Sequence, residues 1–323
     1  MVGWNRAKRP RIGINPSYSA PLDPFMPLVF AILLEESSNT YNHAFAIGVQ
    51  IEAIMLELDV ISSKGEEMVF RISGVTPALV NSLRRTILSD TPILAIHEVM
   101  FFENESPMHD EIVSHRLGLI PLTTPPDKYV QPELCDCKSE LGCAKCRVSL
   151  LLDVTSAADR PTVVYSGDLK SEDPEVQPVS TKIPITKLGP SRRLKLEAYA
   201  RVGIGSSHAK WQPAATVSYK SQPIVTVTPQ CDACAACVAA CPQKILKTQE
   251  GKLVVVDTDL CTVCRDCVKA CPQDPPAIVP ERIRDNFIFF IQSTGALHPT
   301  ELVSIAARML KEKANSVSKA TGG

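Results

Sequence analysis

The sequence lacks a charge excess of either sign and any apolar segment long enough to span a membrane. Its 323 residues carry 34 Lys and Arg against 35 Asp and Glu, a formal net charge of −1. A dedicated nucleic-acid-binding chain usually has a clear basic excess or patch. The nearest apolar run, Phe25 to Leu34, is interrupted by Pro27 and followed by Glu35, and is too short for a span. We therefore expect no direct nucleic-acid contact and no membrane association.

Sequence motifs of catalytic sites are also missing. The chain has no P-loop and no nucleophile elbow. Gly203-Ile204-Gly205 lacks the third glycine and the following helix of a dinucleotide site, so a turn is expected there. His97, His109 and His115 have no close partners along the sequence that would indicate a metal or catalytic role. We expect no catalytic residue in this chain.

The composition indicates a packed protein. Hydrophobic residues make up 45% of the chain and charged residues 21%, which is the balance of globular domains, and the length allows for two or three of them. Residues 1–50 are proline-containing and show little periodicity. They are predicted to form an N-terminal extension that is either poorly ordered or non-native, that is, upstream of the natural start.

Eight cysteines form two copies of one spacing. Cys231-x-x-Cys234-x-x-Cys237-x-x-x-Cys241-Pro242 is repeated by Cys261-x-x-Cys264-x-x-Cys267-x-x-x-Cys271-Pro272. This is the bacterial ferredoxin run for two [4Fe–4S] clusters, in which the fourth cysteine ligates the other cluster. One predicted cluster has the ligands Cys231, Cys234, Cys237 and Cys271, and the other has Cys261, Cys264, Cys267 and Cys241. Zinc and disulfides are the alternatives, but zinc needs only four ligands and disulfides need an oxidising compartment. Because iron–sulfur spacing argues against an oxidising compartment, we expect a cytoplasmic protein.

Another group of cysteines has a different spacing. Cys135-x-Cys137-x5-Cys143-x-x-Cys146 lies on a short loop that contains glycine and lysine. Four thiolates on such a loop suit a structural zinc ion, which can replace a missing core. The alternative is a surface loop with four reduced cysteines.

Two amphipathic helices are predicted far apart in the chain. In the first, Thr76 is the N-cap candidate and Pro77 the first helical residue. The second begins near Pro299. Their apolar faces comprise Leu79, Val80, Leu83 and Ile87 in the first and Leu302, Val303, Ala306 and Leu310 in the second.

Alternating and apolar runs predict strands around these helices. The expected strands cover residues 51–60, 68–72, 93–102, 148–154, 162–165, 194–202, 216–219 and 282–294. A further short helix is expected at 110–117.

Three short stretches indicate a family. Asn81-Ser82-Leu83-Arg84-Arg85, Ile96-His97-Glu98-Val99 and the run from His115 to Leu122 strongly resemble the α-like subunits of RNA polymerase. The resemblance is to the archaeal members, the D-type subunits, which are similar to the third-largest subunit of eukaryotic RNA polymerase II. It extends roughly from Ile51 to Lys313.

This resemblance implies an α+β fold with a split dimerisation domain, two helices on a small sheet, formed by residues 51–95 and 281–315. A mostly-β domain (96–229) and a ferredoxin-like iron–sulfur domain (230–280) would be inserted into it. The apolar faces of the two helices would meet a smaller α-like partner, the L subunit, which buries surface the domain cannot cover alone. Arg84, Arg85 and Arg116 would contact the large catalytic subunits.

The function implied is that of a non-catalytic assembly subunit of DNA-directed RNA polymerase, a nucleotidyltransferase. The chain has no Asp-x-Asp-x-Asp run of the kind that holds catalytic magnesium in polymerases, which agrees with that role. Family members with a single cluster exist, and a [3Fe–4S] form is a further alternative. Eukaryotic relatives have a similar four-cysteine zinc loop with a shorter middle spacing. The ferredoxin run taken alone favours a different function, an electron-transfer subunit of an oxidoreductase.

Overall fold

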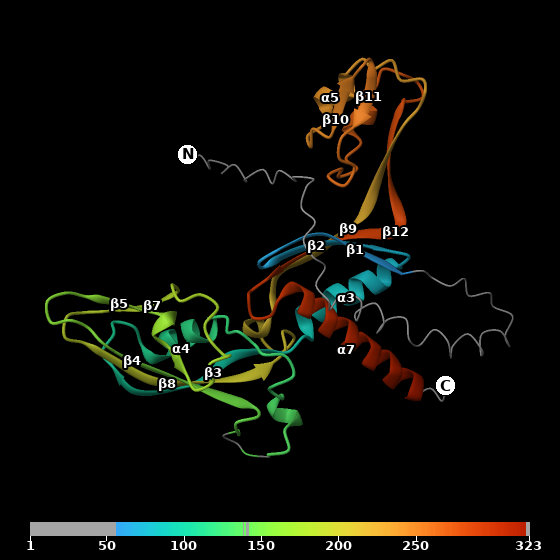
Figure 1. Ribbon diagram of the computed structural model, residues 1–323. Coiled ribbons are helices and arrows are strands. Elements are labelled where there is room, and N and C mark those ends of the chain that lie inside the picture. The colour runs from blue at the N-terminus through green and yellow to red at the C-terminus, as the bar shows by residue number, and fades with distance from the viewer. Residues whose placement is uncertain (1–55, 138, 140–141, 321–323) are drawn as a thin grey trace.

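A computed structural model describes residues 56–137, 139 and 142–320. The extension predicted for residues 1–50, and the first half of the strand predicted at 51–60, lie outside the described residues. Figure 1 shows one sheet carrying two long helices, a second sheet to one side, and a small unit at the far end of a two-stranded ribbon. No helix in the described ranges combines the length and apolar character of a membrane span.

The first sheet is antiparallel, with the strand order β1, β2, β12, β9. Its strands are β1 (Glu57–Lys64), β2 (Glu67–Ser73), β12 (Ile278–Ser293) and β9 (Ala214–Val227). The two predicted helices, α3 (Pro77–Ser89) and α7 (Pro299–Ala320), pack against each other and on this sheet. The α7 helix continues past residue 315, where the sequence placed the end of the domain.

Local sequence and packing both account for α3. Its predicted N-cap is confirmed, because the Thr76 side chain accepts a hydrogen bond from the Leu79 N–H at 3.3 Å. The sheet below it contributes aromatic rings to the first core, with Phe70 stacked on Phe289 at a centroid distance of 5.0 Å. Burying such rings removes a large apolar area from water.

The second sheet has the strand order β3, β8, β4, β6. Its strands are β3 (Ile93–Asn104), β8 (Arg193–Gly203), β4 (Arg147–Thr155) and β6 (Lys170–Ser171). The helix α4 (Asp110–Gly118) packs against β3. The strands β5 (Thr162–Tyr165) and β7 (Pro184–Leu188) pair as an antiparallel two-stranded ribbon, and α4 also contacts β7. Three 3-10 turns lie in the connections: η2 (Pro132–Leu134), η3 (Ser166–Asp168) and η4 (Ala209–Trp211). A separate core forms in this part.

The strand β3 connects the two cores. At its start Ile93 and Ala95 belong to the first core, whereas Leu94 and Ile96 belong to the second. Successive side chains of a strand point to opposite faces. The four buried apolar residues at the start of β3 therefore contribute alternately to the first core and to the second.

The position of β9 differs from the expectation. The sequence placed residues 96–229 in one inserted domain and predicted only residues 216–219 as a strand. Instead, β9 pairs with β12 from Val227 opposite Ile278 to Ala214 opposite Ser293, so it is an edge strand of the first sheet. Its middle contains polar residues and Pro223, which weaken the sequence signal of a strand although the pairing partner holds it in place.

The small unit contains most of the second cysteine region. Its elements are α5 (Ala236–Ala240), β10 (Leu246–Gln249), β11 (Lys252–Val255) and α6 (Asp266–Lys269). Its core contains only Cys237, Ile245, Leu246 and Ile278 as buried residues. The whole molecule therefore has a mixed α+β fold in which one part has a far smaller core than the others.

Candidate metal centres and partner surface

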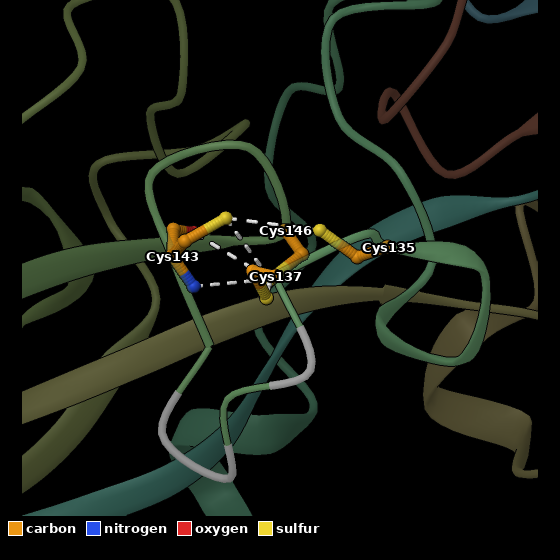
Figure 2. Close-up of side chains that lie close together, drawn as sticks. All are labelled: Cys135, Cys137, Cys143 and Cys146. Atoms are coloured by element: carbon orange, nitrogen blue, oxygen red, sulfur yellow. Dashed lines mark hydrogen bonds between the residues drawn. The ribbon is translucent and has the colours of Figure 1, made fainter.

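The loop before β4 brings four thiols together. Cys135 follows η2 and Cys146 immediately precedes β4, so both ends of the loop are anchored by regular structure. The ligand atoms of Cys135, Cys137, Cys143 and Cys146 lie within 4.8 Å of one another, as Figure 2 shows. All four are free cysteines. The structure therefore groups every member of the sequence-predicted zinc set.

The spacing of these sulfurs matches that around a single ion. The Sγ–Sγ distances are 3.7 Å for Cys135–Cys143, 3.9 Å for Cys137–Cys146 and 3.8 Å for Cys143–Cys146. A tetrahedral zinc ion with Zn–S bonds of about 2.3 Å has ligand sulfurs about 3.8 Å apart. The residues present thus fit a tetrahedral metal site.

A backbone N–H in the loop favours the thiolate form of Cys143. The Lys145 N–H points at the Cys143 sulfur (3.4 Å) and the Cys143 N–H at the Cys146 sulfur (3.1 Å). The Lys145 N–H lowers the pKa of the Cys143 thiol to about 7, despite partial burial. Burial raises the pKa of the Cys146 thiol. Four adjacent thiols cannot all ionise without a cation, so a divalent ion is the natural counter-charge.

The second cysteine region forms two hollows, each lined by four cysteines. One hollow is lined by Cys231, Cys234, Cys237 and Cys271. The other is lined by Cys241, Cys261, Cys264 and Cys267. These are the two ligand sets that the crossed ferredoxin pattern predicts, so the structure places the fourth cysteine of each run with the first three of the other. A [4Fe–4S] cube holds its thiolates farther apart than one ion does, and a hollow suits it.

The cysteine loops repeat an unusual backbone conformation. Ala233 and Ala235 have positive φ values of 55° and 63°, and Val263 and Arg265, at the matching positions of the second run, have 56° and 64°. This conformation is energetically unfavourable for residues other than glycine. Turns of this kind can direct successive N–H groups at an anion, and the Val263 N–H points at the Cys261 sulfur at 3.4 Å. The loops therefore fit an iron–sulfur cluster, whose thiolates and sulfides are negative.

An ion pair connects the second of these loops to the first sheet. Arg71 on β2 bridges to Asp259 at 2.7 Å and to Asp59 on β1 at 3.2 Å. Lys220 on β9 donates a hydrogen bond to the Asp259 carbonyl. The Asp259 N–H donates a hydrogen bond to the Asp257 carboxylate at 3.0 Å, which caps the turn before Cys261.

The eight residues predicted as a partner surface divide into two groups. Val80, Leu83, Ile87, Leu302, Val303 and Ala306 are buried in the first core of this chain. Leu310 is half-buried against that core, and Leu79 is 42% exposed. The six buried residues are already covered by the chain's own sheet and helices, so they are not exposed for contact with a partner.

The three arginines expected to contact large subunits also differ from one another. Arg116 donates a hydrogen bond to the Ile185 carbonyl at 2.7 Å and so ties α4 to β7. Arg84 binds the Asn81 amide oxygen one turn earlier on α3. Arg85 is exposed. Arg85 and Arg116 are both exposed residues, but the Arg116 guanidinium has a structural partner in the Ile185 carbonyl.

One cluster was missed by sequence reasoning. His97 Nδ1 lies 2.7 Å from the Lys210 ammonium and its ring stacks on Trp211 with centroids 5.4 Å apart, partners that the sequence did not reveal and that are not metal ligands. The Lys210 ammonium also lies 4.4 Å from the Trp211 ring centroid. His97 is on β3 and its partners are on η4, far away in the sequence, so no local spacing could reveal them.

Most of the chain is similar to one family of known proteins. The model of the RNA polymerase Rpb3/Rpb11 dimerisation domain matches residues 69–314. This range begins in β2, continues through both sheets and the cysteine-bearing unit, and ends inside α7.

Curated relatives match over nearly their whole length. DNA-directed RNA polymerase subunit Rpo3 of Methanothermobacter thermautotrophicus is 45% identical over 254 residues, 78% of this chain and 93% of the relative. The same subunit of Methanosphaera stadtmanae is 39% identical over 264 residues, 81% of this chain and 97% of the relative. That of Pyrococcus horikoshii is 36% identical over 261 residues, 81% and 96% respectively.

Proposed function

This chain belongs to the RNA polymerase Rpb3/Rpb11 dimerisation family, and from that premise we propose how it serves a DNA-directed RNA polymerase. It is a non-catalytic assembly subunit, part of a nucleotidyltransferase complex without performing the transfer itself. The electron-carrier alternative finds no support, because the relatives that match most of the chain are polymerase subunits.

The observation that carries this proposal is the extent of the family match. It includes all of α3 and most of α7, the two helices on the first sheet, although they are separated in sequence by the second sheet and the cysteine unit. A dimerisation domain of this family implies an Rpb11-like partner. We propose that the partner is the small L subunit, and that the D-type subunit of the resemblance and the Rpo3 of the relatives are one and the same. A polymerase subunit works beside the genome, so we propose a cytoplasmic location.

The partner surface is proposed to lie on the outward sides of α3 and α7. Leu79 on α3 is 42% exposed and Val317 near the end of α7 is 62% exposed. Leu310 on α7 is half-buried against the first core. Apolar side chains in these positions would lose contact with water when an Rpb11-like subunit packs against the helices.

The metal sites are proposed to brace parts of the molecule that have little core. We propose zinc at Cys135, Cys137, Cys143 and Cys146, and a [4Fe–4S] cluster in each of the two four-cysteine hollows. When bound, these groups supply folding free energy. The residues of this chain contribute thiolates, inward-facing N–H groups and a closed loop around each site.

Binding of the Rpb11-like L subunit to the purified full-length chain tests the proposed function. We expect a stable 1:1 heterodimer by light scattering, and Leu79→Asp should weaken it at least about tenfold, because an unpaired charge would be buried. Leu151→Asp is the matched control, since Leu151 on β4 is also 42% exposed but lies on the other sheet. A wild-type chain that does not bind the L subunit would refute the function, and equal binding by Leu79→Asp would refute the surface.

A further inference from the structure

The two cysteine runs are entered through the same kind of turn, but the turns carry different residues. In each run the N–H of the first cysteine, Cys231 or Cys261, donates a hydrogen bond to the carbonyl of the threonine three residues earlier, at 3.1 Å and 2.9 Å respectively. The residue after that threonine is Pro229 in the first run and Asp259 in the second. Only the second turn therefore presents a carboxylate at this position.

Asp259 holds the second turn on the first sheet. Its carboxylate pairs with Arg71 on β2 at 2.7 Å, and its carbonyl accepts a hydrogen bond from Lys220 on β9. Arg71 and Lys220 both lie directly opposite Ile288 of β12 in the strand register, and directly opposite residues share one face of a sheet. Phe289, the next residue of β12, belongs to the first core together with residues of α3 and α7. The two cations therefore lie on the face away from these helices.

The Arg71 guanidinium is partly shielded from water at this position. The Arg71 side chain is 28% exposed and that of Asp259 is 32% exposed. The Arg71 Nε is buried without a hydrogen-bond partner among the described residues. The other carboxylate that binds Arg71, that of Asp59, is 67% exposed. Charge-assisted hydrogen bonds are stronger where water is excluded, so Asp259 is the better-shielded partner of Arg71.

The first cysteine loop follows β9 directly along the chain but has no equivalent side-chain anchor. Asp232 accepts hydrogen bonds from the Cys234 N–H at 3.2 Å and from the Gln273 side chain at 3.3 Å, both within the cysteine unit. Among the described residues, no ion pair joins 228–237 to the first sheet. Exposure does not separate the two ligand sets, because each has one exposed cysteine, Cys234 or Cys264. The anchor at Asp259 thus distinguishes two otherwise similar loops.

We propose that Arg71 and Lys220 are positioning residues for the second cluster. They hold the turn that leads into Cys261 on the first sheet, so that retention of this cluster, and not of the first, depends on a contact with the dimerisation domain. Both residues act through Asp259, the one through its carboxylate and the other through its carbonyl. The proposal rests on the proposed clusters, because it concerns how the chain keeps one of them.

Cysteine alkylation during iron removal tests the proposal for each cluster separately. The anaerobically purified full-length chain is treated with the iron chelator bathophenanthroline disulfonate, and samples taken over time are alkylated with iodoacetamide and analysed by mass spectrometry. The cysteines of a cluster become reactive when that cluster is lost, so each ligand set reports its own rate. The first set is Cys231, Cys234, Cys237 and Cys271, and the second is Cys241, Cys261, Cys264 and Cys267.

The variant Asp259→Asn removes the charge of the anchor and keeps the size of the side chain. We expect the second set to become reactive at least about threefold faster, because a partly shielded ion pair that holds the loop is lost, and the first set to react at the wild-type rate. Asp266→Asn is the matched control, since Asp266 directly precedes the ligand Cys267 but pairs at 3.5 Å with Lys269 of the same unit. It should leave both rates unchanged. Equal reaction of the second set in wild type and Asp259→Asn, or equal acceleration of both sets, would overturn the proposal.

Variants of Arg71 provide an independent measurement. Arg71→Met keeps the apolar stem but removes the charge, and should accelerate the second set as Asp259→Asn does. Because both changes break the same ion pair, the double variant should release the second cluster no faster than either single variant, and Arg71→Lys should restore part of the wild-type rate. Effects that multiply in the double variant would overturn the anchor.

The same measurement separates failure of the anchor from failure of the clusters. Alkylation of both sets in the wild-type chain before any chelator is added would refute the proposed clusters, and the anchor with them. Slow alkylation that Asp259→Asn leaves unchanged would refute the anchor alone. The proposed assembly role is judged separately, by binding of the L subunit.

Discussion

Asp173 anchors the segment that leads into the four-cysteine loop. It pairs with the Lys128 ammonium at 2.8 Å and accepts a hydrogen bond from the Tyr129 hydroxyl. The Asp173 side chain is only 11% exposed. Its partners hold the carboxylate in the charged form, and the Lys128 hydrogen bond lowers the pKa of Asp173 to about 2 from 3.8.

This pKa shift predicts an acid-sensitive contribution to stability. A folded-state pKa below the unfolded value stabilises the protein above about pH 4, and the contribution is lost as the pH falls toward about 2. We expect Asp173→Asn to lower the free energy of unfolding at pH 7, as measured by urea denaturation. Between about pH 4 and about pH 2 the free energy of unfolding of this variant should fall less steeply than that of the wild type. The exposed Asp159→Asn is the control. Parallel pH profiles for wild type and Asp173→Asn would contradict the assignment.

The zinc proposal makes a prediction for Cys143. The substitution Cys143→Ser removes one of the four thiolates of the tetrahedral group. Substitution of residues that only hydrogen-bond a metal ligand lowers metal affinity roughly 10- to 100-fold. Loss of a ligand should therefore lower zinc affinity by more than that. Competition with a chromogenic chelator measures the change. Cys264→Ser, which alters an exposed cysteine of the other region, should leave zinc affinity unchanged. Equal zinc affinity in wild type and Cys143→Ser would exclude the site.

At the scale of elements, the end of β8 and the turn after it pack closely against the C-terminal end of α3. The Ser206 N–H donates a hydrogen bond to the Ser89 carbonyl at 2.9 Å. A Cβ at Gly205 would lie 2.1 Å from the Leu88 carbonyl oxygen. The glycine therefore permits two backbones to approach, which is a packing role. The turn expected at Gly203-Ile204-Gly205 is confirmed at Gly205.

This close contact predicts that Gly205→Ala destabilises the protein. The added methyl group must displace either the turn or the last turn of α3, and overpacking of this kind costs about 1–3 kcal/mol. Gly189→Ala is the matched control, because only the Arg192 side chain at 3.7 Å lies near its Cβ position. Guanidinium denaturation of both variants measures the difference. A Gly205→Ala protein as stable as Gly189→Ala would show that the two elements are not packed as described.

At the scale of the whole molecule, stability is unevenly divided. The first two cores contain many large buried side chains, whereas the cysteine unit contains few. The Arg71–Asp259 ion pair and the β9–β12 ribbon connect that unit to the first sheet. If the proposed clusters are bound, a unit with so small a core would depend on them for folding.

Removal of iron should therefore unfold one part of the molecule selectively. Hydrogen exchange of the anaerobically purified chain, before and after iron chelation, should show loss of protection in residues 231–277 and retained protection in β3, β8 and β12 near Phe289. The physical reason is that the first two cores need no metal ion to exclude water. Unchanged exchange in residues 231–277 would contradict the role proposed for the clusters.

Most elements could be predicted from the sequence, but their burial could not. The Thr76-capped helix and the strands at 162–165 and 194–202 depend on local periodicity and are confirmed, with small shifts of their ends. The apolar face of α3 was also identified, yet the sequence could not distinguish Val80, covered by the chain itself, from Leu79, left exposed. Both are apolar residues on the same helix, and only the position of the sheet separates them.

The sequence by itself determined what depends on neighbours along the chain: the caps and faces of the helices, and the cysteine spacings, whose crossed grouping the two four-cysteine hollows reproduce. A loop of fixed length limits where its thiols can reach, so spacing carries that information. Only the tertiary structure decided that β9 joins the first sheet and that His97 meets Lys210. Such contacts join distant segments, and their free energy depends on how whole surfaces pack, which no single segment of sequence records.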